Sequence, residues 1–513
     1  MVLVDIHDLP ESYDKTFRLL AICRLMHAID DKHLNNHMSP FMKKYFSKAF
    51  DMASRLKNNR LLSYACGYIA QIIEKENKYA IPLTQRAIML AQEKHQDLMF
   101  MWQCQIARLL INQSNISGAL SAYGSAIELL TPSKNIPPDC KHSCSGMLQS
   151  FLRGFRGSHL NFEKQVKPVY VAYCDLLLSQ NKQEMTLEAR NIMERLKSIE
   201  LADYYQDECM IIKSKKIPEV LPDDAAIIYP MVLDKSLKIL LTISDKTIQK
   251  TVHISAIHIQ KKARRLREML QKPYHYSNKR YKYLAQRFYD WTIRPIKDEL
   301  EMHQIKTLVI APDNCFRLLP FSVFMDNNQY LIEKFAIVTV PSISLIDFQS
   351  KKQNSRNILL CGLSDGIPAL PQVPKELTDI NQIFPGKIYL NETFNYQQIA
   401  NAFKNNHYNI VHMSTHGRFD QSQHRTYLQL HKERLSINQL EKLIQISVVR
   451  QTPVDLLTLS ACHSAADNER SAMGLAGLAV KAGVQSVVAS LWRISDQAAY
   501  DMMIEFLSTV EAD

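Results

Sequence analysis

After residue 224 the chain alternates short apolar runs with helical segments, and this alternation restricts its fold more than any other feature. The strand-like runs are AAIIYPMVL, LKILLTIS, KTLVIAP, FAIVTVP, RNILLCG, YNIVHMS, VDLLTLS and VQSVVASLW. Segments of helical character, such as ELTDINQIF, NYQQIANAF and GLAGLAVKAG, separate several of them. Strands that alternate with helices in this way are typical of a mostly parallel sheet covered by helices. We therefore predict an α/β fold for this part of the chain.

The N-terminal part of the chain has only helical patterns. Three segments carry an alanine at an equivalent place, Ala49, Ala87 and Ala126, with spacings of 38 and 39 residues. Ala80 and Ala119 precede the last two by seven residues and fall on the same helical face. A repeat of this length predicts stacked helical pairs, and the pattern resembles a tetratricopeptide (TPR) array. An ordinary helical bundle is the alternative.

Composition and targeting signals favour a cytoplasmic protein of more than one domain. The 513 residues exceed what a single hydrophobic core usually holds. The N-terminal stretch carries Asp5, Asp8 and Glu11 and no apolar core segment, so no signal peptide is predicted. No run of about 18 apolar residues could span a bilayer, and the ten cysteines are scattered like free cytosolic thiols. The Cys140–Cys144 cluster has poor spacing for zinc, so neither a metal nor a cofactor is predicted.

Two of the apolar runs end in residues that can carry chemistry. The run Tyr408–Asp420 ends at His416 and Gly417, and the run Val454–Ala465 ends at Cys462. The carboxyl ends of strands are where open α/β sheets place their functional residues. A cysteine reacts as its thiolate, and a nearby imidazole can take the thiol proton. We therefore predict a Cys462 nucleophile with His416 as its base.

The residues around this pair complete the predicted chemistry. Gly417 has no Cβ, so its backbone N–H can face a substrate carbonyl and form an oxyanion hole together with the Cys462 amide. His412 is expected to be a satisfied strand histidine, and His463 is expected to point away from the nucleophile. The reaction would be thiolate attack on a peptide carbonyl, formation of an acyl-enzyme and hydrolysis. A purely structural buried thiol is the alternative for Cys462.

Several segments together resemble a known family. The stretches HMSTHG, LSACHSA and GLAGLAVKAGVQSVVASLWRISDQAAYDMMIEF resemble the CHAT peptidase domain, a caspase-like family associated with TPRs and related to separase. The upstream stretches IAPDNCFRLLPFSVF, LIEKFAIVTVPSISLI and LPQVPKELTDINQIF resemble further segments of that family, so the likeness runs from about Asp224 to Leu507. It implies that His416 is the catalytic histidine and Cys462 the nucleophile.

The resemblance also implies where the substrate's P1 side chain binds. Ser460, two residues before the nucleophile, would line the S1 pocket, and Ser490–Trp492 of the next strand would form its other wall. Asp496 lies just beyond and could pair with a basic P1 side chain. It could equally be the N-cap of the helix Gln497–Leu507, which is the reading we favour.

These observations predict a multidomain protein. We expect an all-α TPR-like domain at residues 1–215, a non-catalytic, caspase-like support part of the CHAT domain at 224–346, and its catalytic part at 347–513. The segment Lys215–Asp224 has two prolines and no helical stripe, so it is the expected boundary.

The predicted function is that of a cysteine endopeptidase of the caspase and separase type. We expect it to be latent until a regulatory protein binds the repeats, because an always-active endopeptidase would damage its own cytosol. The resemblance implies a place in bacterial antiviral defence or programmed cell death, for example in cleaving a gasdermin-like pore former. The expected partners are a protein substrate and an activating protein, with no membrane and nucleic acid at most indirectly.

Two alternatives remain. The first is a catalytically silent TPR and CHAT scaffold within a defence complex, such as a CRISPR-associated one. The second is nucleic-acid binding through the basic segment Gln260–Lys272, in a chain of net charge +11. That segment is more simply the solvated face of an amphipathic helix, because no aromatic interleaving or binding motif accompanies it.

Overall fold

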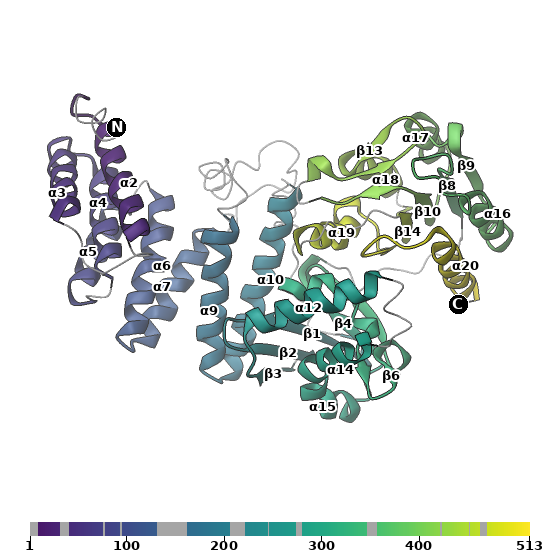
Figure 1. The fold of residues 1–513 in the computed structure, drawn as a ribbon, viewed down its shortest axis with the longest axis horizontal. Coiled ribbons are helices and arrows are strands. Elements are labelled where there is room, and N and C mark those ends of the chain that lie inside the picture. The colour runs from purple at the N-terminus through teal and green to yellow at the C-terminus, as the bar shows by residue number, and fades with distance from the viewer. Residues whose placement is uncertain are drawn as a thin grey trace. The chain divides into compact units, whose positions relative to one another are not determined.

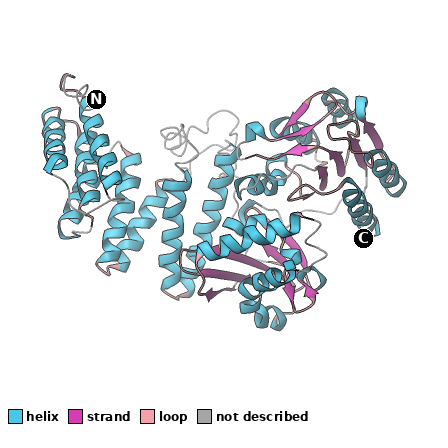
Figure 2. Ribbon diagram, viewed as in Figure 1, coloured by secondary structure: helices cyan, strands magenta, loops and turns pink. Residues whose placement is uncertain are grey.

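The computed structural model forms two compact units, residues 1–180 and 181–513 (Figures 1 and 2). It describes residues 9–30, 40–74, 77–92, 95–130, 162–205, 221–244, 246–272, 280–345, 357–420, 423–450, 452–461 and 469–512. Within these ranges, no helix combines the length and the apolar character needed to cross a bilayer.

The first unit is entirely helical in its described part (Figure 2). Its elements are α2 (Tyr13–Asp30), α3 (Pro40–Arg55), α4 (Asn59–Ile72), α5 (Asn77–Ala91), α6 (Gln96–Asn112), α7 (Ile116–Glu128), the short π-helix η1 (Phe162–Val166) and α9 (Lys167–Ser179). Successive helices pack on one another, α4 on α5, α5 on α6 and α6 on α7. The repeated alanines Ala49, Ala87 and Ala126 are completely buried. The prediction of a helical region with TPR-like repeats is thus confirmed.

Small residues let these helices approach closely. A Cβ added at Gly67 of α4 would lie 2.3 Å from the Trp102 ring of α6. The Trp102 indole Nε1 donates to Ser63 Oγ at 2.9 Å, and Ser63 Oγ donates to the carbonyl of Ala87 at 2.7 Å. Three neighbouring helices are therefore joined by one buried chain of hydrogen bonds.

The first sheet of the second unit is a mixed sheet of order β3-β2-β1-β4-β7. Its strands are β1 (Ala225–Val232), β2 (Leu237–Ile243), β3 (Lys246–Val252), β4 (Thr307–Ile310) and β7 (Ala336–Thr339). Strands β1, β2 and β3 pair antiparallel, whereas β1 with β4 and β4 with β7 are parallel. Helices α12 (Ala256–Gln271) and α14 (Arg280–Thr292) share its hydrophobic core. We call residues 221–345 the support half.

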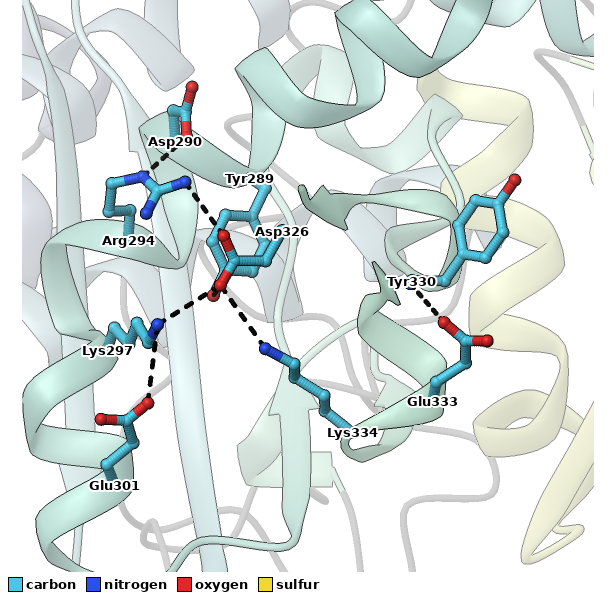
Figure 3. A network of polar contacts seen from close by, with 9 residues as sticks. All are labelled: Tyr289, Asp290, Arg294, Lys297, Glu301, Asp326, Tyr330, Glu333 and Lys334. Atoms are coloured by element: carbon cyan, nitrogen blue, oxygen red, sulfur yellow. Dashed lines mark hydrogen bonds and ion pairs between the residues drawn. The ribbon is translucent and has the colours of Figure 1, made fainter. Parts of the chain in front are cut away.

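A buried carboxylate anchors the end of α14 within the support half (Figure 3). Asp326, in β5 (Met325–Asp326), accepts hydrogen bonds from Arg294 at 3.1 Å, Lys297 at 3.3 Å and Lys334 at 3.4 Å. The Tyr289 hydroxyl donates to the same carboxylate at 3.2 Å. Burial opposes the charge of Asp326, but the hydrogen bonds from Lys297 and Arg294 outweigh it and lower the pKa of this carboxyl.

The later part of the second unit contains a fully parallel sheet of order β15-β14-β10-β8-β9. Its strands are β8 (Ile358–Gly362), β9 (Lys387–Leu390), β10 (Ile410–Thr415), β14 (Leu456–Ala461) and β15 (Ser486–Ala489). We call residues 357–512 the parallel-sheet half. The predicted α/β fold with a parallel sheet is confirmed.

Helices cover both faces of this parallel sheet, and strand residues alternate between them. Leu359 and Val411 share a core with α17 (Tyr396–Asn405), α18 (Ile437–Val449) and α19 (Glu469–Ala482). Their chain neighbours Ile358 and Ile410 instead share a core with α16 (Val373–Ile383) and α20 (Asp496–Ala512). The strands are therefore buried on both sides, which explains their almost continuous apolar sequence.

Helix α10 (Gln183–Tyr205) belongs to the second unit. It contacts β3 of the support half and α19 of the parallel-sheet half. The division between the units therefore falls after Gln180, whereas the expected boundary Lys215–Asp224 lies mostly outside the described residues. The domain bounds 1–215, 224–346 and 347–513 stay predictions.

Candidate active site

The strands that lead to the two candidate catalytic residues are parallel neighbours. Strands β10 and β14 pair along their length, and Thr415, the last residue of β10, is the register partner of Ala461, the last residue of β14. His416 follows Thr415 in the chain, and Cys462 follows Ala461. Cys462 itself lies outside the described residues, so its role stays a prediction.

The imidazole of His416 is held by a backbone carbonyl. Its Nε2 lies 2.6 Å from the carbonyl oxygen of Pro368, in the segment between β8 and α16. A carbonyl can only accept, so Nε2 carries the hydrogen and Nδ1 of the neutral ring keeps a lone pair. Gly366 lies flat against the ring, since a Cβ there would be 3.0 Å from the His416 Cδ2 atom. The contact with the Pro368 carbonyl fixes the tautomer, and together with Gly366 it fixes the orientation of this half-buried imidazole.

The backbone after this histidine is also fixed. Strand β11 (Gly417–Arg418) pairs antiparallel with β12 (Tyr427–Gln429), and the Gln429 amide donates to the carbonyl of His416 at 2.7 Å. Gly417 and Leu428 therefore form a non-hydrogen-bonded pair, in which the ladder does not use the Gly417 amide. Its expected role in an oxyanion hole stays a prediction.

A buried polar network lies on the same two strands. His412 of β10 contacts Thr458 of β14 through Nδ1 at 2.6 Å and Glu376 of α16 through Nε2 at 2.9 Å. The Ser414 hydroxyl donates to the other Glu376 oxygen at 3.1 Å. All four side chains are buried. His412 is thus a satisfied strand histidine, as the sequence predicts, and the network ties β10, β14 and α16 together.

The residues expected to shape the S1 pocket have different surroundings. Ser460 is buried on β14, and Trp492 packs against the hydrophobic core of the support half. Asp496 accepts from the Gln372 amide at 2.7 Å, just before α16. The expected role of Asp496 as the N-cap of the last helix is wrong. Ser495 holds that place, because its hydroxyl accepts from the Ala498 amide at 3.2 Å.

Two features of the site were missed by the sequence reasoning. The Pro368 carbonyl is backbone, so no side chain signals it. Glu376 is the glutamate of the LPQVPKE segment. A carboxylate in a helix that covers an apolar strand was the sequence signal for a buried polar partner.

The described cysteines are poor nucleophiles. Cys23, Cys66, Cys104, Cys174, Cys315 and Cys361 are all buried free thiols. Burial raises the pKa of Cys23 to about 11 and of Cys104 to about 12, and it also raises those of Cys66, Cys315 and Cys361. A buried thiol with a raised pKa carries little thiolate at neutral pH.

No metal centre is found in the part of the chain that the structure describes, since no three His, Cys, Asp or Glu side chains there are grouped suitably. The Cys140–Cys144 cluster lies outside that part.

The parallel sheet with helices on both faces is an open α/β fold, and His416 follows one of its central strands. Residues 282–512 match the family model of the CHAT domain. That match suggests a caspase-like, peptidase-related fold for this part of the chain, and the N-terminal helices are consistent with TPR-like repeats. Comparison with curated proteins finds no match.

Proposed function

We propose that this protein is a cysteine endopeptidase in which Cys462 is the nucleophile and His416 the base. The observation that carries the proposal is the contact between His416 Nε2 and the Pro368 carbonyl. It leaves the Nδ1 lone pair as the proton acceptor on a ring that is already oriented. The histidine also follows a strand that lies beside the one leading to Cys462.

The proposed reaction needs only groups of this chain, the peptide and water. The Cys462 thiol gives its proton to His416 Nδ1, and the thiolate attacks the scissile carbonyl carbon. The oxyanion accepts hydrogen bonds from the amides of Gly417 and Cys462. The imidazolium then protonates the leaving amine, and the acyl-enzyme forms. A water molecule gives a proton to His416, attacks the thioester and releases the acid together with the thiol.

The Pro368 carbonyl supports both stages of this cycle. It is a fixed acceptor for the Nε2 hydrogen, so it holds the orientation of the ring through the cycle. A histidine oriented in this way needs no carboxylate partner. Ser460, Trp492 and Asp496 remain proposed contacts for the P1 side chain.

We further propose that the enzyme is latent and that an activating protein binds the TPR-like helices. By family resemblance it would act in the cytoplasm, in bacterial antiviral defence or programmed cell death, with a substrate such as a gasdermin-like pore former. A catalytically silent scaffold in a defence complex is the second candidate, because a peptidase fold can also serve as a docking platform.

Cleavage of a peptide library by the full chain, with and without candidate partners, tests the proposal. Wild type is expected to cleave, while Cys462→Ala and His416→Ala are inactive. His407→Ala, which removes an exposed histidine of the same half, is the matched control and retains activity. Equal cleavage by wild type and Cys462→Ala, or no cleavage under any condition, would leave the scaffold as the answer.

A further inference from the structure

The last turn of α10 contacts the segment that follows the candidate base. The Tyr204 hydroxyl donates to the carbonyl of Asp420 at 2.9 Å and lies 3.0 Å from Thr426 Oγ1. The Asp420 amide donates to the same Thr426 oxygen at 3.1 Å. Tyr204 is thus buried against the chain that runs from β11 to β12, directly after His416 and Gly417.

The next residue of α10 contacts the helix that follows the candidate nucleophile in the chain. The Tyr205 hydroxyl donates to the carbonyl of Gly474 in α19 at 2.5 Å. Arg470 of α19 pairs with Asp203 of α10 at 2.6 Å. A Cβ added at Gly477 would lie 2.5 Å from a side-chain carbon of α10, so side chains of α10 pack directly against the backbone of α19. Two consecutive tyrosines therefore hold the chain after His416 and the helix after residue 462.

The preceding turns of α10 are fixed in the support half. Three buried polar contacts join the two: Glu194 with Ser342 at 2.6 Å, Lys197 with the Pro312 carbonyl at 2.6 Å, and Glu200 with Arg317. The C-terminal half of one helix thus makes directional bonds to both the support half and the parallel-sheet half. Such buried networks favour a single arrangement of the groups they join.

We propose that Tyr204 and Tyr205 are positioning residues that keep the histidine-bearing and cysteine-bearing segments in a working arrangement. This inference rests on the proposed peptidase function and names how that site is held. Only Gln180, Asn181 and Lys182 separate α10 from α9 of the first unit. Neither tyrosine touches the substrate. Each acts through the backbone of its neighbour.

The test removes one hydroxyl at a time and keeps the rings. Tyr204→Phe, Tyr205→Phe and the double variant of the full chain are compared with wild type. Tyr289→Phe is the matched control, because it also deletes a buried tyrosine hydroxyl, the one bonded to Asp326 in the support half (Figure 3). The readouts are kcat and KM for a cleaved peptide, and the pH dependence of Cys462 alkylation followed by mass spectrometry.

In the double variant, kcat falls by roughly ten- to a hundredfold while KM changes little, because small displacements of reacting groups cost that much. Its alkylation rate also rises at a higher pH than in wild type. Tyr289→Phe behaves like wild type in both readouts. If the double variant matches Tyr289→Phe in kcat and in pH profile, the inference is wrong while the peptidase function stands. If wild type shows neither cleavage nor a reactive Cys462, the function and the inference fall together.

Discussion

Replacement of Gly474 by alanine tests whether the packing of α10 on α19 is as tight as its geometry states. The new Cβ would lie 2.3 Å from Tyr204 Cζ and 2.5 Å from its hydroxyl oxygen, against 3.4 Å or more for ordinary contact. The ring would have to move by about 1 Å, the difference between those values. The ring has little room to move, because Tyr204 is buried and bonded to Asp420 and Thr426.

The sign of the effect follows from two opposing magnitudes. Alanine in place of glycine inside a helix is favourable by about 1 kcal/mol. Overpacking costs about 1–3 kcal/mol, and loss of the Tyr204 hydrogen bonds adds about 1 kcal/mol. We expect Gly474→Ala to lower the stability of the second unit by roughly 1–3 kcal/mol on balance.

Differential scanning calorimetry of the full chain is the assay. A loss of this size lowers the transition of a large domain by several degrees, at about 2–4 °C per kcal/mol. Gly124→Ala in α7 is the control, since its Cβ would meet the Tyr173 hydroxyl only at 3.4 Å, an ordinary contact. It should leave its own unit as stable as wild type or slightly more so. A Gly474→Ala protein as stable as wild type would refute the close packing.

Three further substitutions test the buried groups around the two sheets. Burial lowers the pKa of Lys197 from 10.5 to about 8. Between these two pH values the unfolded chain binds more protons than the folded chain. The free energy of unfolding should therefore rise with pH in this range, by up to about 3 kcal/mol relative to Lys197→Met. Parallel pH-stability curves for the two proteins would contradict this. Glu376→Ala leaves His412 without its buried acceptor and should cost roughly 3 kcal/mol in thermal unfolding; a change below about 0.5 kcal/mol would show that the network contributes little. Asp326→Ala leaves three cations around a vacated site and should destabilise more at low salt than at high salt, since salt screens their repulsion; a salt-independent loss would argue against that electrostatic cause.

The strands that lead to the two candidate catalytic residues could be predicted from sequence because burial on both faces gives continuous apolar runs. The neighbouring ends of β10 and β14 follow from such runs, from the helices between them and from the short connections of parallel sheets. The repeated alanines were equally visible, since close helix packing requires small residues at a fixed period.

Other features depend on polar contacts between distant segments, which periodicity does not report. Helix α10 has the pattern of one more helix of the N-terminal array. It belongs to the second unit because Tyr204, Tyr205 and Lys197 bond to residues more than 100 positions away. The Pro368 carbonyl could not be foreseen either, because a backbone oxygen has no sequence signature. For Asp496 the sequence allows both roles, and the hydrogen bond from the Ala498 amide identifies Ser495 as the cap of the helix.

The pH dependence of Cys462 alkylation, in wild type and in His416→Ala, tests the proposed thiol and imidazole pair most directly. Mass spectrometry of the peptide that contains Cys462 follows the alkylation of this residue alone. The six described thiols are buried and should react slowly. We predict that the wild-type rate rises well below the ordinary thiol value of about 8.5, and that His416→Ala returns the rise to that value. Identical profiles with a rise near the ordinary value in both proteins would contradict a catalytic dyad.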